Sequence, residues 1–490
     1  MSIVILASVA LATGLATVFL GGRRRNMAFA IGVAGGVAVL GIALAMPPEE
    51  SLAIGGGGIV ATPLVRSLAV SWSASLLLLA LLEFGIGARP AVVGPSLIGL
   101  AAAAIALAIN DPATSMAALA AGGVAGVVIP GLIGWLDGPS SASRLPTTGR
   151  GALAILGSGL LALAVIAWGA SAASPLGGGG IFGQDQGTLL GTGLALLVMV
   201  AAVAIRCGLI PLHVWAARFM EGVSPLAVPA AFSWGMAAFI LIALPWSQVA
   251  LGPSAIGDVE RVLIIGLSVA SLVLGGLAAM VHDDIEHVLG YSILQDAGIA
   301  VLAFASLAPD AVAASRDWLI ASATVKTAFA AWAAVVRSTY GGHRLADLGG
   351  WARHSPALGI AFAGILVAAV GLPGLALFEA RADLVSGSMP AFGSIVALLV
   401  ALMPLIYLGR IALAGIAPVT AAIAAGPSGR PRFGAGRAAG WSEGSRMQAV
   451  RLLRAGGRAN RAPLMALAVV VLAAIAVVTS IGGTGGVVGG

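Results

Sequence analysis

Apolar stretches of about 20 residues follow one another along almost the whole chain, and polar positions lie mostly in short segments between them. This is the length that an α-helix needs to cross the hydrocarbon core of a bilayer. The pattern therefore predicts an all-α polytopic membrane protein with about fourteen transmembrane helices. The predicted spans are 2–20, 26–46, 64–86, 90–109, 114–136, 151–172, 188–210, 225–246, 261–281, 287–306, 315–337, 356–385, 392–416 and 463–482.

The composition agrees with this pattern. Hydrophobic residues make up 59% of the 490 residues and charged residues only 9%, whereas soluble proteins carry ~25% charged residues. The single cysteine, Cys207, excludes an internal disulfide. The sequence has no glycine-rich phosphate loop and no HExxH or CxxC motif, so we expect no metal and no cofactor in this chain itself.

Charged residues in the predicted loops indicate how the helices are oriented across the membrane. Arginines concentrate in loops that follow odd-numbered spans, and acidic residues concentrate in loops that follow even-numbered spans. The positive-inside rule then places the arginine-rich loops in the cytoplasm and both termini outside a bacterial plasma membrane. The net charge of +6 has the same origin, so we expect no nucleic-acid binding. These arginines are Arg23, Arg24, Arg25, Arg89, Arg144, Arg150, Arg218, Arg337, Arg344, Arg353 and those between 430 and 461.

Two spans are interrupted by glycine and proline. The seventh runs through Arg206 into the segment 208–211 (GLIP), and the twelfth runs into 371–374 (GLPG) with Arg381 beyond. Such segments kink or unwind because proline removes a backbone donor. Two interrupted spans five apart are typical of a transporter with internal repeats, although membrane helices also contain glycine and proline for packing alone. Spans 4–8 and 9–13 would be two inverted five-helix repeats.

These features divide the chain into five predicted parts. An N-terminal three-helix segment, 1–86, precedes a first repeat at 87–250 and a second repeat at 251–416. A basic cytoplasmic loop, 417–462, and a C-terminal transmembrane helix, 463–490, complete the chain. The loop is rich in glycine and arginine, so it is either a disordered connector or a segment that docks at the membrane surface.

Lys326 is the most informative charged residue in a predicted span. It lies in the middle of an apolar helix, and it is the only lysine among the 25 lysine and arginine residues. Arginine keeps its proton inside proteins, whereas a buried lysine can release one. The residue type therefore predicts a proton-transfer group. The alternative is a structural lysine paired with an acid, and Asp296 in span 10 is its candidate partner.

Other charged residues lie near the breaks and span ends. Arg206 is an electrostatic element or part of a structural ion pair. Glu379 and Asp383, on either side of Arg381, do not share its helix face, so this group marks a water path or an interfacial cap. The candidate proton-transfer residues near span ends are His213, Glu286 and His287, which are equally typical of a solvated loop. Their spacing does not indicate a metal site.

Three stretches of the chain carry the motifs of a known membrane-protein family. Residues 206–215 (RCGLIPLHVW), with EGVSP at 221–225, are similar to a lysine followed by a Pro-Leu-His-x-Trp core and a proline segment. Residues 284–292 (DIEHVLGYS) are similar to a DIKRLLAYSS element. Residues 326–329, 343–350 (HRLADLGG) and 371–373 are similar to a lysine helix, a DLxxLGG loop and a GLPP break. The set resembles the antiporter-like subunits of respiratory complex I, membrane-bound hydrogenases and multi-subunit cation/proton antiporters.

The resemblance implies that protons cross through two linked half-channels joined by buried charges. Lys326 matches the central lysine, Arg206 the lysine of the first broken helix, and Arg381 the lysine or glutamate of the second. The chain also departs from the family. Residues 112–136 contain no ionisable group where the family has a glutamate, and the lysine position of span 8 falls near Gly235. The first repeat therefore lacks a titratable pair.

From the resemblance we expect a proton-translocating membrane-arm subunit of a redox-driven complex, with no catalytic site of its own. Its partners would be other membrane-arm subunits and a peripheral redox module, in which iron–sulfur clusters, flavin or a nickel–iron site would lie. The transported ion would be the proton, with Na⁺ as an alternative. Two other functions stay open, a subunit of a multi-subunit Na⁺/H⁺ antiporter and a non-pumping scaffold subunit of the same complex.

Overall fold

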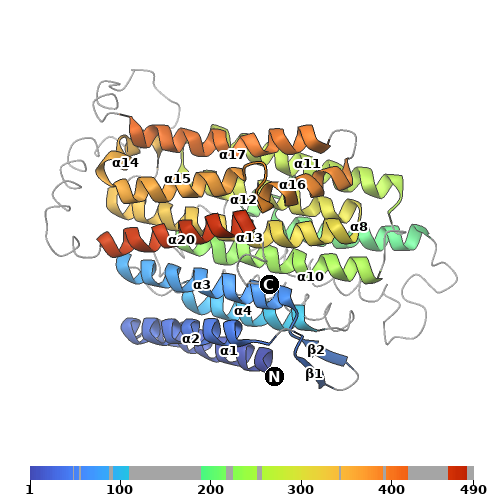
Figure 1. Ribbon diagram of the computed structural model, residues 1–490, viewed down its shortest axis with the longest axis horizontal. Helices are drawn as coiled ribbons and strands as arrows, with labels where there is room; N and C mark the ends of the chain where they lie inside the picture. Colours follow the sequence, from blue (N-terminus) through green and yellow to red (C-terminus); the bar gives the residue numbers. More distant parts are fainter. Residues whose placement is uncertain are drawn as a thin grey trace.

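The computed structural model is a bundle of long helices that lie side by side along one direction (Figure 1). It describes residues 1–21, 23–47, 49–54, 57–87, 92–109, 189–216, 224–250, 256–340, 344–389, 393–417 and 462–482. The longer helices are α1 (Ser2–Gly21), α2 (Arg25–Ala45), α3 (Pro63–Ile86), α4 (Val93–Ala108), α8 (Leu189–Cys207), α10 (Gly235–Ala250), α11 (Asp258–Val281), α12 (Ile285–Val301), α13 (Pro309–Tyr340), α15 (Pro356–Val370), α16 (Ala376–Ser388), α17 (Gly393–Ile416) and α20 (Ala462–Gly482).

Short helical turns complete these elements. A 3₁₀ turn η2 (Pro225–Ala227) and a π-helical turn η3 (Pro229–Trp234) lead into α10, and η5 (Leu302–Ala305) extends α12. The turn η6 (Leu345–Leu348) and the short α14 (Trp351–His354) connect α13 to α15. A hairpin of β1 (Ser51–Ile54) and β2 (Gly57–Val60) pairs antiparallel, with Ser51 opposite Val60. The sequence analysis did not predict this hairpin, because four-residue strands beside a glycine run look the same as an apolar loop.

The helices confirm the prediction of an all-helical polytopic membrane protein. Within the described residues, eight helices are long and apolar enough to cross a membrane, or nine if a pair bent by 112° around residue 355 is one span. The predicted spans coincide with helices wherever the structure describes them. Spans 114–136 and 151–172 lie outside the described residues, as does almost all of the loop 417–462.

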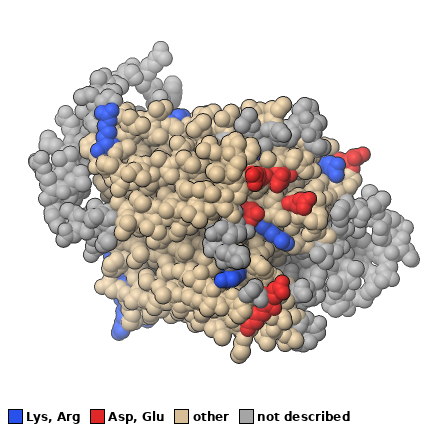
Figure 2. Space-filling model, viewed as in Figure 1, with Lys and Arg blue, Asp and Glu red and all other residues tan. Residues whose placement is uncertain are grey.

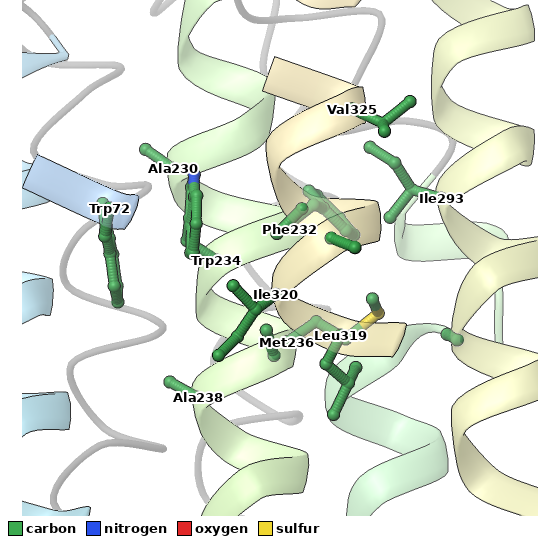
Figure 3. Packing of buried hydrophobic residues seen from close by; sticks show 14 of the residues in the cluster. Trp72, Ala230, Phe232, Trp234, Met236, Ala238, Ile293, Leu319, Ile320 and Val325 are labelled. Atoms are coloured by element: carbon green, nitrogen blue, oxygen red, sulfur yellow. The ribbon is translucent and has the colours of Figure 1, made fainter. Parts of the chain in front are cut away.

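Helix α13 forms the centre of the bundle. Its apolar window is completely buried by its neighbours, although its sequence includes Lys326. Figure 3 shows Leu319 and Ile320 of α13 packed near Trp234, whose indole stacks on that of Trp72 with 5.5 Å between ring centroids. Helices α11 and α12 approach closely at Gly298, where an added Cβ would lie 2.8 Å from the Ser268 carbonyl oxygen. Small residues permit this close packing in membranes.

Both predicted helix breaks are confirmed. Helix α8 ends at Cys207, and Gly208 follows with a φ of +66°. Helix α15 ends at Val370, and Gly371 follows with a φ of +57° before α16 begins. Glycine takes this left-handed conformation without the steric cost that a side chain would bring. Each break exposes carbonyl groups at a helix C-terminus, and these groups need partners inside the protein.

Candidate functional site, a buried lysine–aspartate pair beside a broken helix

Lys326 and Asp296 form an ion pair in the interior of the bundle. The Lys326 Nζ lies 3.2 Å from Asp296 Oδ2, and the two residues are 4% and 6% exposed. Helix α13 supplies the lysine and α12 supplies the aspartate. The predicted pairing is therefore confirmed. Two opposite charges tolerate this burial because each is the counter-ion of the other.

Neighbouring polar groups hold the two helices in place around the pair. The Trp318 Nε1 donates a hydrogen bond to the Asp296 carbonyl oxygen at 3.0 Å and so fixes α12 against α13. On the other side, the Trp234 Nε1 donates to Thr327 Oγ1 at 3.0 Å. Thr327 adjoins Lys326 and itself donates to the Ala323 carbonyl oxygen at 2.7 Å. The lysine therefore lies in a turn of α13 that contacts α12 on one side and η3 on the other.

Arg381 joins the pair from the second broken helix. Its side chain is 1% exposed and donates to the carbonyl oxygens of Val370 at 3.0 Å and Ala369 at 3.5 Å, the last residues of α15. A cation at this position complements the negative end of the helix dipole. The guanidinium also lies over the Trp318 ring, 5.0 Å from its centroid, and close enough to Asp296 for their charges to interact.

Arg206 occupies the first break and is 8% exposed. Its guanidinium lies against Gly235, where an added Cβ would come within 2.7 Å of Nη2. A glycine at this position of α10 therefore makes room for the long arginine side chain. Two differences from the family's pattern are therefore in contact, the arginine at position 206 and the glycine at 235 in place of a lysine.

The other candidate residues lie away from the pair. Glu379 and Asp383 are exposed, whereas Arg381 between them points into the core, as their spacing predicts. Figure 2 shows the acidic side chains that are visible on one face in its right half, and basic side chains both at its left edge and among these acidic ones. His213, Glu286 and His287 gather at one end of α12. Glu286 forms an ion pair with Arg337 there.

Two residues of the site were not found from the sequence. Trp318 connects Asp296 to Arg381, and its position near a span end gave no signal of this contact. Tyr407 of α17 is 1% exposed, and its hydroxyl lies near Asp296 and Arg381. A tyrosine in the middle of an apolar span was an available signal, because a phenol buried in lipid-facing helices needs a polar partner. Among the described residues no group of three or more His, Cys, Asp or Glu could hold a metal ion.

A polytopic bundle with a buried lysine–aspartate pair and two broken helices defines an antiporter-like membrane protein. The chain belongs to the family described as NADH:quinone oxidoreductase/Mrp antiporter, TM, whose model matches residues 154–406, about half of the chain. The matched residues include both helix breaks and Lys326.

Similar proteins include subunit N of NADH-quinone oxidoreductase from Xanthomonas euvesicatoria, 29% identical over 231 residues, which are 45% of each chain. The subunit N of Parvibaculum lavamentivorans is 28% identical over 229 residues, 45% of this chain and 47% of the relative. The chain thus spans about half the length of the curated relatives it matches.

Solved structures share the fold over most of the chain. A chain of respiratory complex I from Thermus thermophilus with bound NADH matches with a TM-score of 0.67 and 19% identity, over 96% of this chain and 99% of the other. A chain of the Mrp complex from Dietzia sp. matches with a TM-score of 0.64 and 17% identity, over 99% and 96%. A chain of the archaeal membrane-bound sulfane sulfur reductase matches with a TM-score of 0.67 and 18% identity, over 86% and 74%. These similarities show the antiporter-like fold.

Proposed function

We propose that the chain is a proton-translocating membrane-arm subunit of a redox-driven complex similar to complex I or a membrane-bound hydrogenase. The observation that carries this proposal is the ion pair between Lys326 and Asp296, 3.2 Å apart and buried at the centre of the bundle. In this proposal the chain has fourteen spans, with two inverted repeats at spans 4–8 and 9–13 and both termini outside.

The pair can exchange protons one at a time. A proton that reaches the Asp296 carboxylate neutralises it and removes the counter-ion of the Lys326 ammonium. An ammonium without a counter-ion is costly in a low dielectric, so Lys326 then releases its proton toward the other side. The proton on Asp296 passes to Lys326, which restores the ion pair. Each cycle takes up one proton and releases one.

The fixed charges favour protons over alkali cations. Arg381 adds a positive charge that does not titrate beside the pair, so this group of three residues carries a net positive charge. A sodium ion would have to join a positive site in which the Asp296 carboxylate already contacts Lys326. A proton brings the same charge, but it bonds directly to the Asp296 carboxylate, and Lys326 can release a proton in exchange. A subunit of a Na⁺/H⁺ antiporter is the second candidate, and the similarity in fold to the Mrp complex favours it.

The partners follow from the same proposal. Other membrane-arm subunits would contact the exposed apolar helix faces, and a peripheral module would hold the iron–sulfur clusters, flavin or nickel–iron site. A charge movement in these partners equivalent to ~1.4 kcal/mol would change a proton affinity at the pair tenfold. Small electrostatic changes would therefore couple electron transfer to proton movement.

The test is proton transport by the full chain, purified with the subunits that accompany it and reconstituted in vesicles containing a pH-sensitive dye. We expect Lys326→Ala to reduce transport to the background of empty vesicles. The matched control is Arg353→Ala, which removes an exposed basic residue from α14 and leaves transport unchanged. Normal transport by Lys326→Ala would instead identify the chain as a scaffold. Sodium-dependent transport by the unmodified chain would favour the antiporter.

A further inference from the structure

A row of aromatic and histidine side chains begins at the loop between α11 and α12. The imidazole rings of His282 and His287 stack, with centroids 4.9 Å apart and planes at 14°. The ring of His282 also stacks on Tyr291, at 5.1 Å and 10°. His213, beyond the first break, lies 6.4 Å from the same tyrosine ring. Two imidazoles, those of His282 and His213, thus contact one phenol near the start of α12, and a third, that of His287, stacks on His282.

Ion pairs fix this loop to its neighbours. Arg410 of α17 contacts Asp283 at 2.8 Å, and Arg337 of α13 contacts Glu286. Asp284 accepts a hydrogen bond from the Glu286 backbone N–H at 2.9 Å and so caps α12. These contacts hold the loop against α13 and α17 at the point where the row begins. The loop adjoins the arginine-rich loops that the positive-inside rule places in the cytoplasm.

The polar positions continue along α12 into the core. His287, Tyr291 and Gln295 are four residues apart and form one row of the helix, and Ser292 and Asp296 form the adjacent row. Exposure falls along the first row, from 22% for the His287 side chain to 1% for Gln295, and the second row is buried throughout, with Ser292 0% and Asp296 6% exposed. The second row ends at the ion pair. The two rows thus connect the surface loop to Asp296.

Helix α17 lines the inner part of the rows. The Gln295 Nε2 contacts the Met403 Sδ at 3.4 Å, and the hydroxyl of Tyr407, one turn further, lies beside Ser292. Within the described part of the chain, the Gln295 Oε1 and the Tyr407 hydroxyl are buried and lack a hydrogen bond of acceptable geometry. Buried polar atoms of this kind require a partner, and a water molecule is small enough to supply it.

We propose that these rows of α12 are the hydrated route by which protons from the α11–α12 loop reach Asp296 and Lys326. The proposal rests on the proposed function, and it names a route through the second repeat alone. A proton would pass from the histidine stack along Tyr291 to water held by Gln295, Ser292 and Tyr407, and then to the Asp296 carboxylate. Arg206 and the first break take no part in this route.

The histidine stack suits a proton-collecting role. Burial, and then the adjacent imidazole of His287, hold the pKa of His282 below its ordinary value, while Asp284 and Asp283 act in the opposite direction. The neutral form of His282 is therefore favoured more than in a free imidazole. Tyr291 of α12 stacks on His282, His213 contacts that tyrosine, and the Arg344 backbone pairs with Asp284.

Cysteine accessibility tests the route without requiring transport. Gln295→Cys and Tyr291→Cys are made in a Cys207→Ser background and treated with a small methanethiosulfonate reagent. The control is Ile293→Cys on the same helix, since Ile293 is 0% exposed and lies among buried hydrophobic residues near Val325 (Figure 3). We expect the two row positions to react at least about tenfold faster than the control, because thiolates form in water. Reaction of both at the rate of the control would overturn the route.

A transport experiment distinguishes a failure of this route from a failure of the proposed function. The double variant His282→Gln/His287→Gln is compared with His354→Gln, whose histidine instead bonds the Gly350 carbonyl oxygen at 2.9 Å. We expect the double variant to slow proton uptake about fivefold at pH 8 and less than about twofold at pH 6, where bulk protons are plentiful. Unchanged uptake at both pH values would overturn the route. Normal transport by Lys326→Ala, in the same vesicles, would instead overturn the proposed function.

Discussion

The two broken helices satisfy their exposed carbonyl groups in different ways. At the first break, the neutral indole of Trp215 donates to the Ile205 carbonyl oxygen at 3.1 Å. At the second break, the cationic guanidinium of Arg381 donates to the Val370 carbonyl oxygen at 3.0 Å. The Arg206 cation of the first break instead lies against Gly235. The Ile205 carbonyl oxygen at the first break thus accepts from a neutral indole, and the Val370 carbonyl oxygen at the second break accepts from a cation.

Under the proposed function, this difference would separate a structural break from a break that lies beside the charge site. Arg381 contacts the C-terminus of α15 and lies near Asp296, so the second break is electrostatically linked to Lys326. The first break contacts neutral groups: Trp215 stacks on Phe232 at 5.1 Å, and the Ile210 backbone N–H donates to Ser271 Oγ at 3.1 Å. Through Arg381, the second break thus lies beside the Lys326–Asp296 pair.

The largest expected effect comes from separating the two members of the ion pair. Lys326→Met leaves a buried, unpaired carboxylate and should lower the free energy of unfolding by ~3–5 kcal/mol. The double variant Lys326→Met/Asp296→Leu should recover most of that loss, because it also removes the carboxylate, while Arg381 keeps its hydrogen bonds to the end of α15. Thermal unfolding of the purified chain measures both. Equal losses for the single and double variants would contradict the assignment of the pair as mutually compensating charges.

Removing the charged cap of the second break should have the next largest effect. Arg381→Met deletes charge-assisted hydrogen bonds to the end of α15, so we expect a loss of ~2 kcal/mol in the free energy of unfolding. Proton transport should also fall, since the cation beside Asp296 is gone. Unfolding and vesicle transport are measured on the same preparation. A variant that loses stability but transports normally would show that Arg381 acts only as a cap.

The neutral cap of the first break should matter less. Trp215→Phe keeps the aromatic stack on Phe232 and removes one neutral hydrogen bond, which stabilises by ~1 kcal/mol. Transport should stay close to that of the unmodified chain, because no charge changes. Transport by this variant is compared directly with that of Arg381→Met. A larger transport loss for Trp215→Phe than for Arg381→Met would reverse the roles of the two halves.

The smallest effect is expected at Gly235. Gly235→Ala places a methyl group against the end of the Arg206 side chain, which can shift, so the free energy of unfolding should fall by no more than ~1 kcal/mol. Gly235→Leu is too large for such a shift and should cost more. Transport per folded molecule should be the same for both variants. A transport loss that exceeds the stability loss would indicate that Arg206 takes part in conduction.

Much of this fold could be predicted from the sequence, because the bilayer imposes a length and a hydrophobicity on each helix. The hydropathy pattern predicted the helices, and the positions of glycine and proline predicted both breaks to within a few residues. Asp296 could be proposed as the partner of Lys326 because it is one of few acids inside a predicted span. The hairpin at 51–60 had no comparable signal.

The surroundings of the pair could not be predicted in the same way. Trp318 lies 22 residues from Asp296, and Tyr407 lies on a separate helix, so their contacts depend on how α12, α13 and α17 pack. Helix periodicity gives the direction of a side chain and not its tertiary partner. The contact of Arg206 with Gly235 is of the same kind. The sequence contained both departures from the family, Arg206 and the missing lysine near Gly235. Their contact with each other was visible only in the structure.

The central claim is that Lys326 conducts by releasing its proton, and Lys326→Arg tests it most directly. The variant keeps a positive charge opposite Asp296, so assembly and thermal unfolding should remain close to those of the unmodified chain. Arginine does not deprotonate in proteins, so proton transport in vesicles should fall to background. Transport at the unmodified rate would contradict the account, because it would show that a fixed charge at position 326 is sufficient.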